Sequence, residues 1–224
     1  MNLYILLLAG VGIMTVLMAL QMKHCSVAWW KSIVVSMSLA LTGFLGSELW
    51  YFIENLSIGG RSFFGAIFLS PLVFWPIAKF LRIPYGILMD FIPSAGCITL
   101  ALVKIQCLRD HCCEGRILYM NENYIYVRFP SQLVEMLNFV VLATLLTILS
   151  YKSKMRKKIF PCFFILYGIT RFVLNSFRDG LTVYALGMPA GHFWAVISII
   201  IGIVWLRIFK VYSRKVLCNE DCND

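Results

Sequence analysis

The sequence predicts an all-α, polytopic membrane protein with seven transmembrane helices, and three observations support this fold class. Of its 224 residues, 60% are hydrophobic and only 14% are charged, whereas soluble domains are about 45–50% apolar and about 25% charged. Apolar stretches long enough to cross about 30 Å of hydrocarbon recur from one end of the chain to the other. The basic residues gather in alternate connections between these stretches, as expected when the chain crosses a membrane repeatedly.

Seven apolar windows account for most of the chain. They are residues 1–21, 32–53, 62–81, 86–106, 133–151, 159–177 and 189–209. The first window has almost no charged region before it and no small-residue cleavage site after it, so we expect a retained span rather than a signal peptide. The two longest remaining segments are a predicted extracytoplasmic loop, 107–131, and a short tail, 210–224. The prediction is therefore one membrane domain, 1–224, without a separate soluble domain.

The positions of the basic residues predict the orientation. With the N-terminus outside and the C-terminus in the cytoplasm, thirteen of the 20 Lys and Arg residues lie on the inner side, including the run KSKMRKK at 152–158. The net charge of +9 is thus explained by orientation rather than by nucleic-acid binding. The other seven stand singly and break the rule, which predicts a polar pocket open to the outer face. They are Arg61, Lys104, Arg109, Arg116, Arg128, Arg171 and Arg178.

The stretch FFILYGITRFVLNSFRDG, residues 163–180, places polar groups inside an apolar helix. At 100° per residue, Tyr167, Arg171, Asn175 and Arg178 share one helical face about 80° wide. A buried guanidinium is destabilising by several kcal/mol unless it is paired or hydrated. This face therefore predicts an anionic partner.

Two other segments are candidates for the rest of the pocket. Gly60 and Arg61 form a tight turn that either cradles an anion with its N–H groups or is a plain interfacial turn with a snorkelling arginine. Gln132 and Glu135 are spaced i, i+3 at the start of the fifth window. Glu135 either forms a surface pair with Arg128 or holds one of the pocket arginines in place, and the sequence favours neither.

The densest polar stretch is KIQCLRDHCCEGR, residues 104–116. Cys107 and His111 are spaced i, i+4, and Cys112 and Cys113 follow. Zinc binds Cys and His, but the paired Cys-x-x-Cys spacing of structural sites is missing. A disulfide on an oxidising face and free, packed thiols are the alternatives. Free thiols without a metal or other cofactor are the expectation.

Taken in order, five segments resemble the prolipoprotein diacylglyceryl transferase family. They are GGRSFFGAIF, LMDFIPSAGCITLALVKIQCLRDHCCEGR, PSQLVE, LYGITRFVLNSFR and GMPAGH. The resemblance implies seven spans in a bacterial cell membrane and a site open to the extracytoplasmic side. It also implies a transferase that moves diacylglycerol from phosphatidylglycerol, an anionic phospholipid, to the lipobox cysteine thiol of a preprolipoprotein, with glycerol phosphate leaving.

The resemblance also suggests residue roles. Arg171 is expected to bind phosphate through its planar fork, with Tyr167 one turn back as a donor. His111 is a candidate proton acceptor, because nearby Asp110 and Glu114 raise its basicity. The expected catalytic residues are thus Tyr167, Arg171 and His111. The expected substrate-binding residues are Gly60, Arg61, Lys104, Gly115, Arg116, Gln132, Glu135 and Arg178.

The chain also departs from the family pattern. The family's histidine before the third span falls on Phe64, its signature arginine on Lys104, and its sixth-span glutamate on Asn175. The cysteine loop resembles a divergent branch with a Cys and a Cys-Cys pair. Two alternatives therefore remain: a transferase with another acceptor, and a non-catalytic protein that binds a lipid or a partner. Transport is not favoured, because paired broken helices and repeat symmetry are missing.

Overall fold

The computed structural model describes residues 3–57, 59–110, 112–120, 126–178 and 183–220, and its described part is dominated by seven α-helices. The helices are α1 Leu3–His24, α2 Lys31–Asn55, α3 Phe63–Leu81, α4 Tyr85–Arg109, α5 Ser131–Ser150, α6 Ile159–Asn175 and α7 Ala190–Glu220. A short 3-10 helix, η1, covers Ser153–Met155. Two small antiparallel ribbons complete the fold. They are β1 Ile117–Met120 with β2 Tyr126–Arg128, and β3 Val183–Ala185 with β4 Met188–Pro189.

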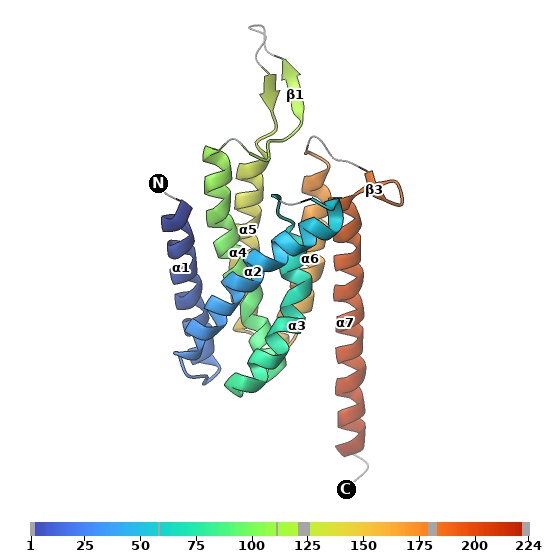
Figure 1. The fold of residues 1–224 in the computed structure, drawn as a ribbon. Helices are drawn as coiled ribbons and strands as arrows, with labels where there is room; N and C mark the ends of the chain where they lie inside the picture. The colour runs from blue at the N-terminus through green and yellow to red at the C-terminus, as the bar shows by residue number, and fades with distance from the viewer. Residues whose placement is uncertain (1–2, 58, 111, 121–125, 179–182, 221–224) are drawn as a thin grey trace.

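The helices alternate in direction, so successive connections lie at opposite ends of the bundle (Figure 1). Helix α2 runs obliquely across the bundle, and the β1–β2 ribbon projects beyond the ends of α4 and α5 (Figure 1). The most extensive packing is between α6 and α7, α4 and α5, α2 and α3, and α1 and α4. The end that carries the β1–β2 ribbon is called the ribbon end below, and the other is the lysine end.

The helices fit a multi-pass membrane protein. By length and composition, five described helices can cross a membrane: α2, α3, α4, α5 and the Ala190–Ile208 part of α7. The Leu8–His24 part of α1 and all of α6 are also apolar but shorter. Large apolar side chains on the helices, such as Leu8, Leu72 and Phe80, are more than two-thirds exposed, as expected for a surface in contact with lipid.

Glycines set the close approach of two helix pairs. A Cβ added at Gly65 in α3 would lie 2.0 Å from the backbone oxygen of Gly46 in α2. A Cβ at Gly168 in α6 would lie 2.8 Å from the carbonyl oxygen of Ala195 in α7. Small residues at such crossings let membrane helices pack backbone to backbone. The second crossing fixes α6 against α7 beside Tyr167.

Asp90 in α4 joins the lysine end of α4 to the start of α6. Its carboxylate accepts hydrogen bonds from the backbone N–H of Lys157 and from that of Ile159, the latter at 3.0 Å. A carboxylate at a helix N-terminus satisfies donors that have no partner within the helix. Asp90 is 5% exposed. This contact fixes the position of α6 relative to α4, and both helices carry cations of the candidate site.

One expectation from the sequence needs correction, and two predicted segments contain more regular structure than hydropathy indicates. Helix α6 ends at Asn175, so Arg178 is not on its polar face. Helix α4 continues to Arg109, into the predicted loop 107–131, which also contains the β1–β2 ribbon. Helix α7 continues to Glu220 through most of the predicted tail 210–224. Hydropathy locates the apolar segments of a chain. It does not locate the ends of the helices, because these depend on capping and on tertiary contacts.

Candidate active site

A single buried carboxylate collects three cations near the ribbon end of the bundle. Glu135, in the second turn of α5, is 2% exposed. Its Oε1 lies 2.8 Å from Nη1 of Arg171 in α6 and 3.8 Å from Nη1 of Arg178. Its Oε2 pairs with Nζ of Lys104 in α4. Glu135 and these three cations are called the Glu135 cluster below, and its formal charge is +2.

The sequence left open whether Glu135 pairs with Arg128 or holds pocket arginines, and the structure favours the second. Arg128 pairs with Glu114, with Nε and Oε2 3.2 Å apart. The side chains of Lys104, Arg171 and Arg178 are only 15–20% exposed. One carboxylate cannot neutralise three such cations, and isolated buried charge is unfavourable. The cluster can therefore accept a further anion.

Arg171 has an unused donor in this cluster. Its Nε is buried and has no hydrogen-bond partner among the described residues. Nη1 is occupied by Glu135. A guanidinium offers five donors in a planar fork, a geometry that matches carboxylate and phosphate oxygens. Arg171 can therefore keep its contact with Glu135 and still bind an anionic ligand.

Arg178 reaches the cluster through a backbone contact rather than through helical periodicity. It forms an isolated antiparallel bridge with Gly115, and the N–H of Arg116 donates to the carbonyl of Phe177 at 2.9 Å. A Cβ at Gly115 would lie 2.4 Å from the carbonyl oxygen of Phe129 and 3.0 Å from that of Phe177, just after α6. The loop after α4 can therefore pack this closely against the end of α6 only with glycine at this position.

Tyr167 forms the apolar wall of the site, one turn before Arg171. It is 2% exposed, and its ring packs edge to face against Phe63 and Phe64, with centroids 5.2 and 5.6 Å away. Phe64 is itself 4% exposed. At the position where the family resemblance implies a histidine, the structure therefore has a packed aromatic ring that cannot transfer a proton.

A second polar group near Arg171 was missed by the sequence analysis. Glu54 in α2 accepts a hydrogen bond from Ser62 at 3.0 Å and lies within electrostatic range of Arg171. Beside it, the Trp50 and Trp194 rings lie 4.9 Å apart, and both buried indole N–H groups lie close enough to Glu54 to interact with its carboxylate. The sequence signal that could have identified Glu54 was its position, directly after an apolar window and five residues before Gly59.

His192 in α7 was also missed, although its segment GMPAGH was noted. Its Nδ1 lies 3.1 Å from Nδ2 of Asn175, and its Nε2 lies 3.2 Å from Oγ of Ser176. A Cβ at Gly191 would lie 2.4 Å from Asn175. Asn175 is 1% exposed, so its role in the structure is to join the end of α6 to the start of α7.

Cys107, Cys112 and Cys113 lie together beside the Glu135 cluster. Their three Sγ atoms lie within 4.8 Å of one another, and all three residues are free thiols. Hydrogen bonding with Cys107, together with the positive charges of Lys104 and Arg178, lowers the pKa of the Cys113 thiol to about 5. The same positive charges therefore favour the deprotonated form of Cys113 over that of an isolated thiol.

The other expected site residues take different places. Arg61 is exposed, lies over the Phe44 ring at 4.7 Å and pairs with Glu48 at 3.5 Å. Gly60 packs against the Tyr51 ring.

The predicted residues after α4 and at the start of α5 also have partners. Arg116 is exposed and lies over Phe177, and Gln132 donates to the Cys112 carbonyl at 2.8 Å. His111, the expected proton acceptor, lies outside the described residues. Lys104, Glu135, Arg171 and Arg178 therefore meet, whereas Arg61 and Arg116 have partners elsewhere.

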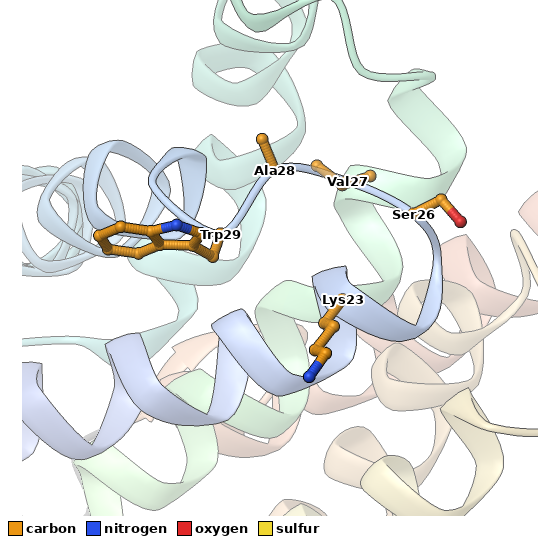
Figure 2. A pocket seen from close by; sticks show the side chains of 5 residues that line it. All are labelled: Lys23, Ser26, Val27, Ala28 and Trp29. Atoms are coloured by element: carbon orange, nitrogen blue, oxygen red, sulfur yellow. The ribbon is translucent and has the colours of Figure 1, made fainter.

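A pocket at the α1–α2 turn lies at the lysine end, far from this site (Figures 1 and 2). It is lined by Lys23, Ser26, Val27, Ala28 and Trp29. Lys23 is its only ionisable lining residue, so it lacks the converging charges of the Glu135 cluster. We therefore place the candidate site at the ribbon end.

Comparison with known proteins identifies the family of the chain. The family model for prolipoprotein diacylglyceryl transferase matches residues 2–208. A phosphatidylglycerol–prolipoprotein diacylglyceryl transferase of Tropheryma whipplei (strain TW08/27) is 22% identical over 220 residues, covering 82% of this chain and 79% of that protein. The match covers the first six helices and the Ala190–Ile208 part of α7, so the chain belongs to the prolipoprotein diacylglyceryl transferase family.

Proposed function

We propose that this protein transfers diacylglycerol from phosphatidylglycerol to the lipobox cysteine thiol of a preprolipoprotein. The observation that carries the proposal is the Glu135 cluster, in which three poorly exposed cations share one carboxylate. The cluster suits a phosphodiester headgroup, which supplies the missing negative charge. The name of the Tropheryma relative supports the same substrates.

In this reaction the cations act on the leaving group. Arg171 binds the phosphate through Nε and its fork, while Lys104 and Arg178 add positive charge. The acceptor thiol loses its proton to water, and its sulfur attacks the glycerol carbon that carries the phosphate. The C–O bond breaks, and its electron pair leaves with glycerol phosphate. Fixed cations stabilise the charge that develops on that oxygen. Tyr167 and the surrounding phenylalanines would cover the acyl-glycerol side of the lipid.

We infer that all seven helices cross the bacterial cell membrane, with the N-terminus outside and the C-terminus in the cytoplasm. Two features support this orientation. The lysine end carries most of the basic loop residues, including Lys152–Lys158. The helices also alternate in direction (Figure 1), so the Glu135 cluster falls at the outer end. A reporter after Asp224 should behave as cytoplasmic, and a tag within 117–127 as external; reversed labelling of either would contradict the orientation.

The test of function is replacement of Arg171 by lysine, which keeps the charge and loses the fork. Loss of one charged hydrogen bond, about 1.5–3 kcal/mol, should lower transfer from phosphatidylglycerol roughly tenfold to a hundredfold. Tyr167→Phe should lower it less. The readouts are lipid binding by the purified protein and the mass of lipoproteins in a bacterium depleted of its own transferase.

Arg207→Lys is the matched control. It makes the same arginine-to-lysine change at an exposed position on α7, outside the site. It should bind lipid and complement like the parent. Arg171→Lys protein that melts normally and binds phosphatidylglycerol like the parent would refute the proposal.

A transferase with another acceptor is the second candidate, and Phe64 favours it. The buried Phe64 ring removes the proton acceptor that the family resemblance implies at this position. Mass spectrometry of the products separates the two candidates. A diacylglyceryl mass on lipobox peptides supports the first, whereas lipid consumption without that product supports the second.

A further inference from the structure

Cys107, Cys112 and Cys113 are arranged like the ligands of a metal site, although their spacing in the sequence is not that of a structural zinc site. Tetrahedral zinc with Zn–S distances of about 2.3 Å places its sulfurs about 3.8 Å apart. The three Sγ atoms of Cys107, Cys112 and Cys113 already lie within 4.8 Å of one another. Small side-chain rotations therefore suffice to bring them to one ion.

The backbone holds the three thiols in this arrangement. Cys113 has φ of +60°, the left-handed region that is unfavourable for a residue with a side chain. The N–H of Cys112 donates to the Cys107 carbonyl at 3.2 Å. Ser131 donates to the Cys113 carbonyl at 2.6 Å, and Gln132 to that of Cys112 at 2.8 Å. The start of α5 thus fixes the loop, so that the adjacent cysteines face the end of α4 together.

The surrounding charge favours a thiolate-bound divalent ion. Three thiolates and one divalent cation carry a net charge of −1, and Lys104 and Arg178 lie within electrostatic range of Cys113. A Cys₃ complex would therefore neutralise part of the excess positive charge beside Glu135. Thiolates select thiophilic ions such as zinc over magnesium or calcium. Three protein ligands leave the fourth position of a tetrahedral ion open.

We propose that Cys107, Cys112 and Cys113 bind a zinc-class divalent cation whose open fourth position accepts the thiol that is to be alkylated. The identity of that fourth ligand rests on the proposed function; the three-thiolate site does not. On binding, the acceptor thiol releases its proton to water and becomes a metal-bound thiolate. Its sulfur forms the C–S bond as the glycerol C–O bond breaks, and the thioether product, a weaker ligand, dissociates. The metal keeps its oxidation state.

The metal is tested on the full-length protein purified in detergent without chelators. About one equivalent of zinc per chain is expected, and Co²⁺ exchanged into the site should show sulfur-to-cobalt charge-transfer absorption. Cys107→Ser and Cys113→Ser should each lose most of the metal. Cys162→Ser, on the lysine end of α6, is the control and should keep it.

Three results would overturn the site. In the first, the parent protein takes up neither zinc nor cobalt. In the second, both serine variants retain the metal. In the third, the native protein contains a disulfide among the three cysteines. The parent measurement needs no variant, so a variant that fails to fold leaves the test intact.

The open position is tested on the cobalt-loaded protein with a cysteine-containing lipobox peptide and its serine analogue. The cysteine peptide should shift the charge-transfer bands, and the serine peptide should leave them unchanged; no shift with either peptide overturns the open position. Bound metal without lipid transfer would contradict the proposed function but not the metal site. Transfer by a metal-free protein would contradict the role of the metal in holding the acceptor thiol but not the proposed function.

Discussion

The two ends of the bundle carry the same kinds of basic residue in opposite environments. At the lysine end, residues such as Lys152 and Lys154 are exposed in the α5–α6 connection. At the ribbon end, Lys104, Arg171 and Arg178 are mostly buried and converge on Glu135. Exposed charge is hydrated and can serve orientation alone, whereas buried charge needs a specific partner. The burial of the basic residues, rather than their number, therefore identifies the end of the bundle that carries the candidate site.

Removal of the Glu135 carboxylate should have the largest effect. Glu135→Gln leaves three cations without their shared anion, and breaking a buried pair typically destabilises by about 3–5 kcal/mol. We expect a much lower thermal midpoint in detergent. Glu48→Gln, which removes the exposed partner of Arg61, should change stability by less than about 1 kcal/mol. Equal effects at the two sites would contradict the distinction between buried and exposed charge.

Loss of the Asp90 carboxylate should have the next largest effect. Asp90→Ala removes the acceptor of two backbone N–H groups at the start of α6, which should destabilise by about 1–3 kcal/mol. Because Asp90 lies far from the Glu135 cluster, the folded variant should keep its affinity for phosphatidylglycerol. A selective loss of lipid binding without a change in melting would instead make Asp90 part of the site.

Arg178→Lys should have a smaller effect than Arg171→Lys. Arg178 lies 3.8 Å from Glu135, compared with 2.8 Å for Arg171, so its contact depends less on the guanidinium fork. We expect lipid binding to weaken by less than about fivefold, the equivalent of about 1 kcal/mol. Titration of both purified variants with a phosphatidylglycerol analogue measures the difference. The reverse order would show that Arg178 is the main phosphate ligand.

Neutralisation of one lysine at the other end should have the smallest effect. Lys154→Gln removes an exposed charge, so both stability and lipid binding should stay within about 0.5 kcal/mol of the parent. The same thermal melt and lipid titration serve as readouts. A marked loss of lipid binding would show that the lysine end also recognises the anionic lipid.

The sequence by itself determined the fold class, because hydropathy and the distribution of charge are additive properties that can be read along the chain. It also singled out Lys104, Glu135 and Arg171 as charged residues inside apolar segments, and Arg178 by its helical spacing from Arg171. It could not decide their partners. The contact of Glu135 with cations from α4, α6 and the following segment depends on helix packing, including the Gly115–Arg178 bridge.

Only the tertiary structure decided the remaining features. Arg178 was assigned to a helical face by periodicity, but α6 ends three residues earlier and a backbone bridge brings Arg178 back to the cluster. In the sequence, nothing distinguishes Glu54, Trp50 and Trp194 from other residues of apolar segments. The contact between α2 and α7 brings them together. The three cysteines lack a zinc-type spacing, yet a left-handed Cys113 and contacts from α5 bring their sulfurs together. Spacing along the chain specifies local geometry, whereas these sites depend on contacts between distant segments.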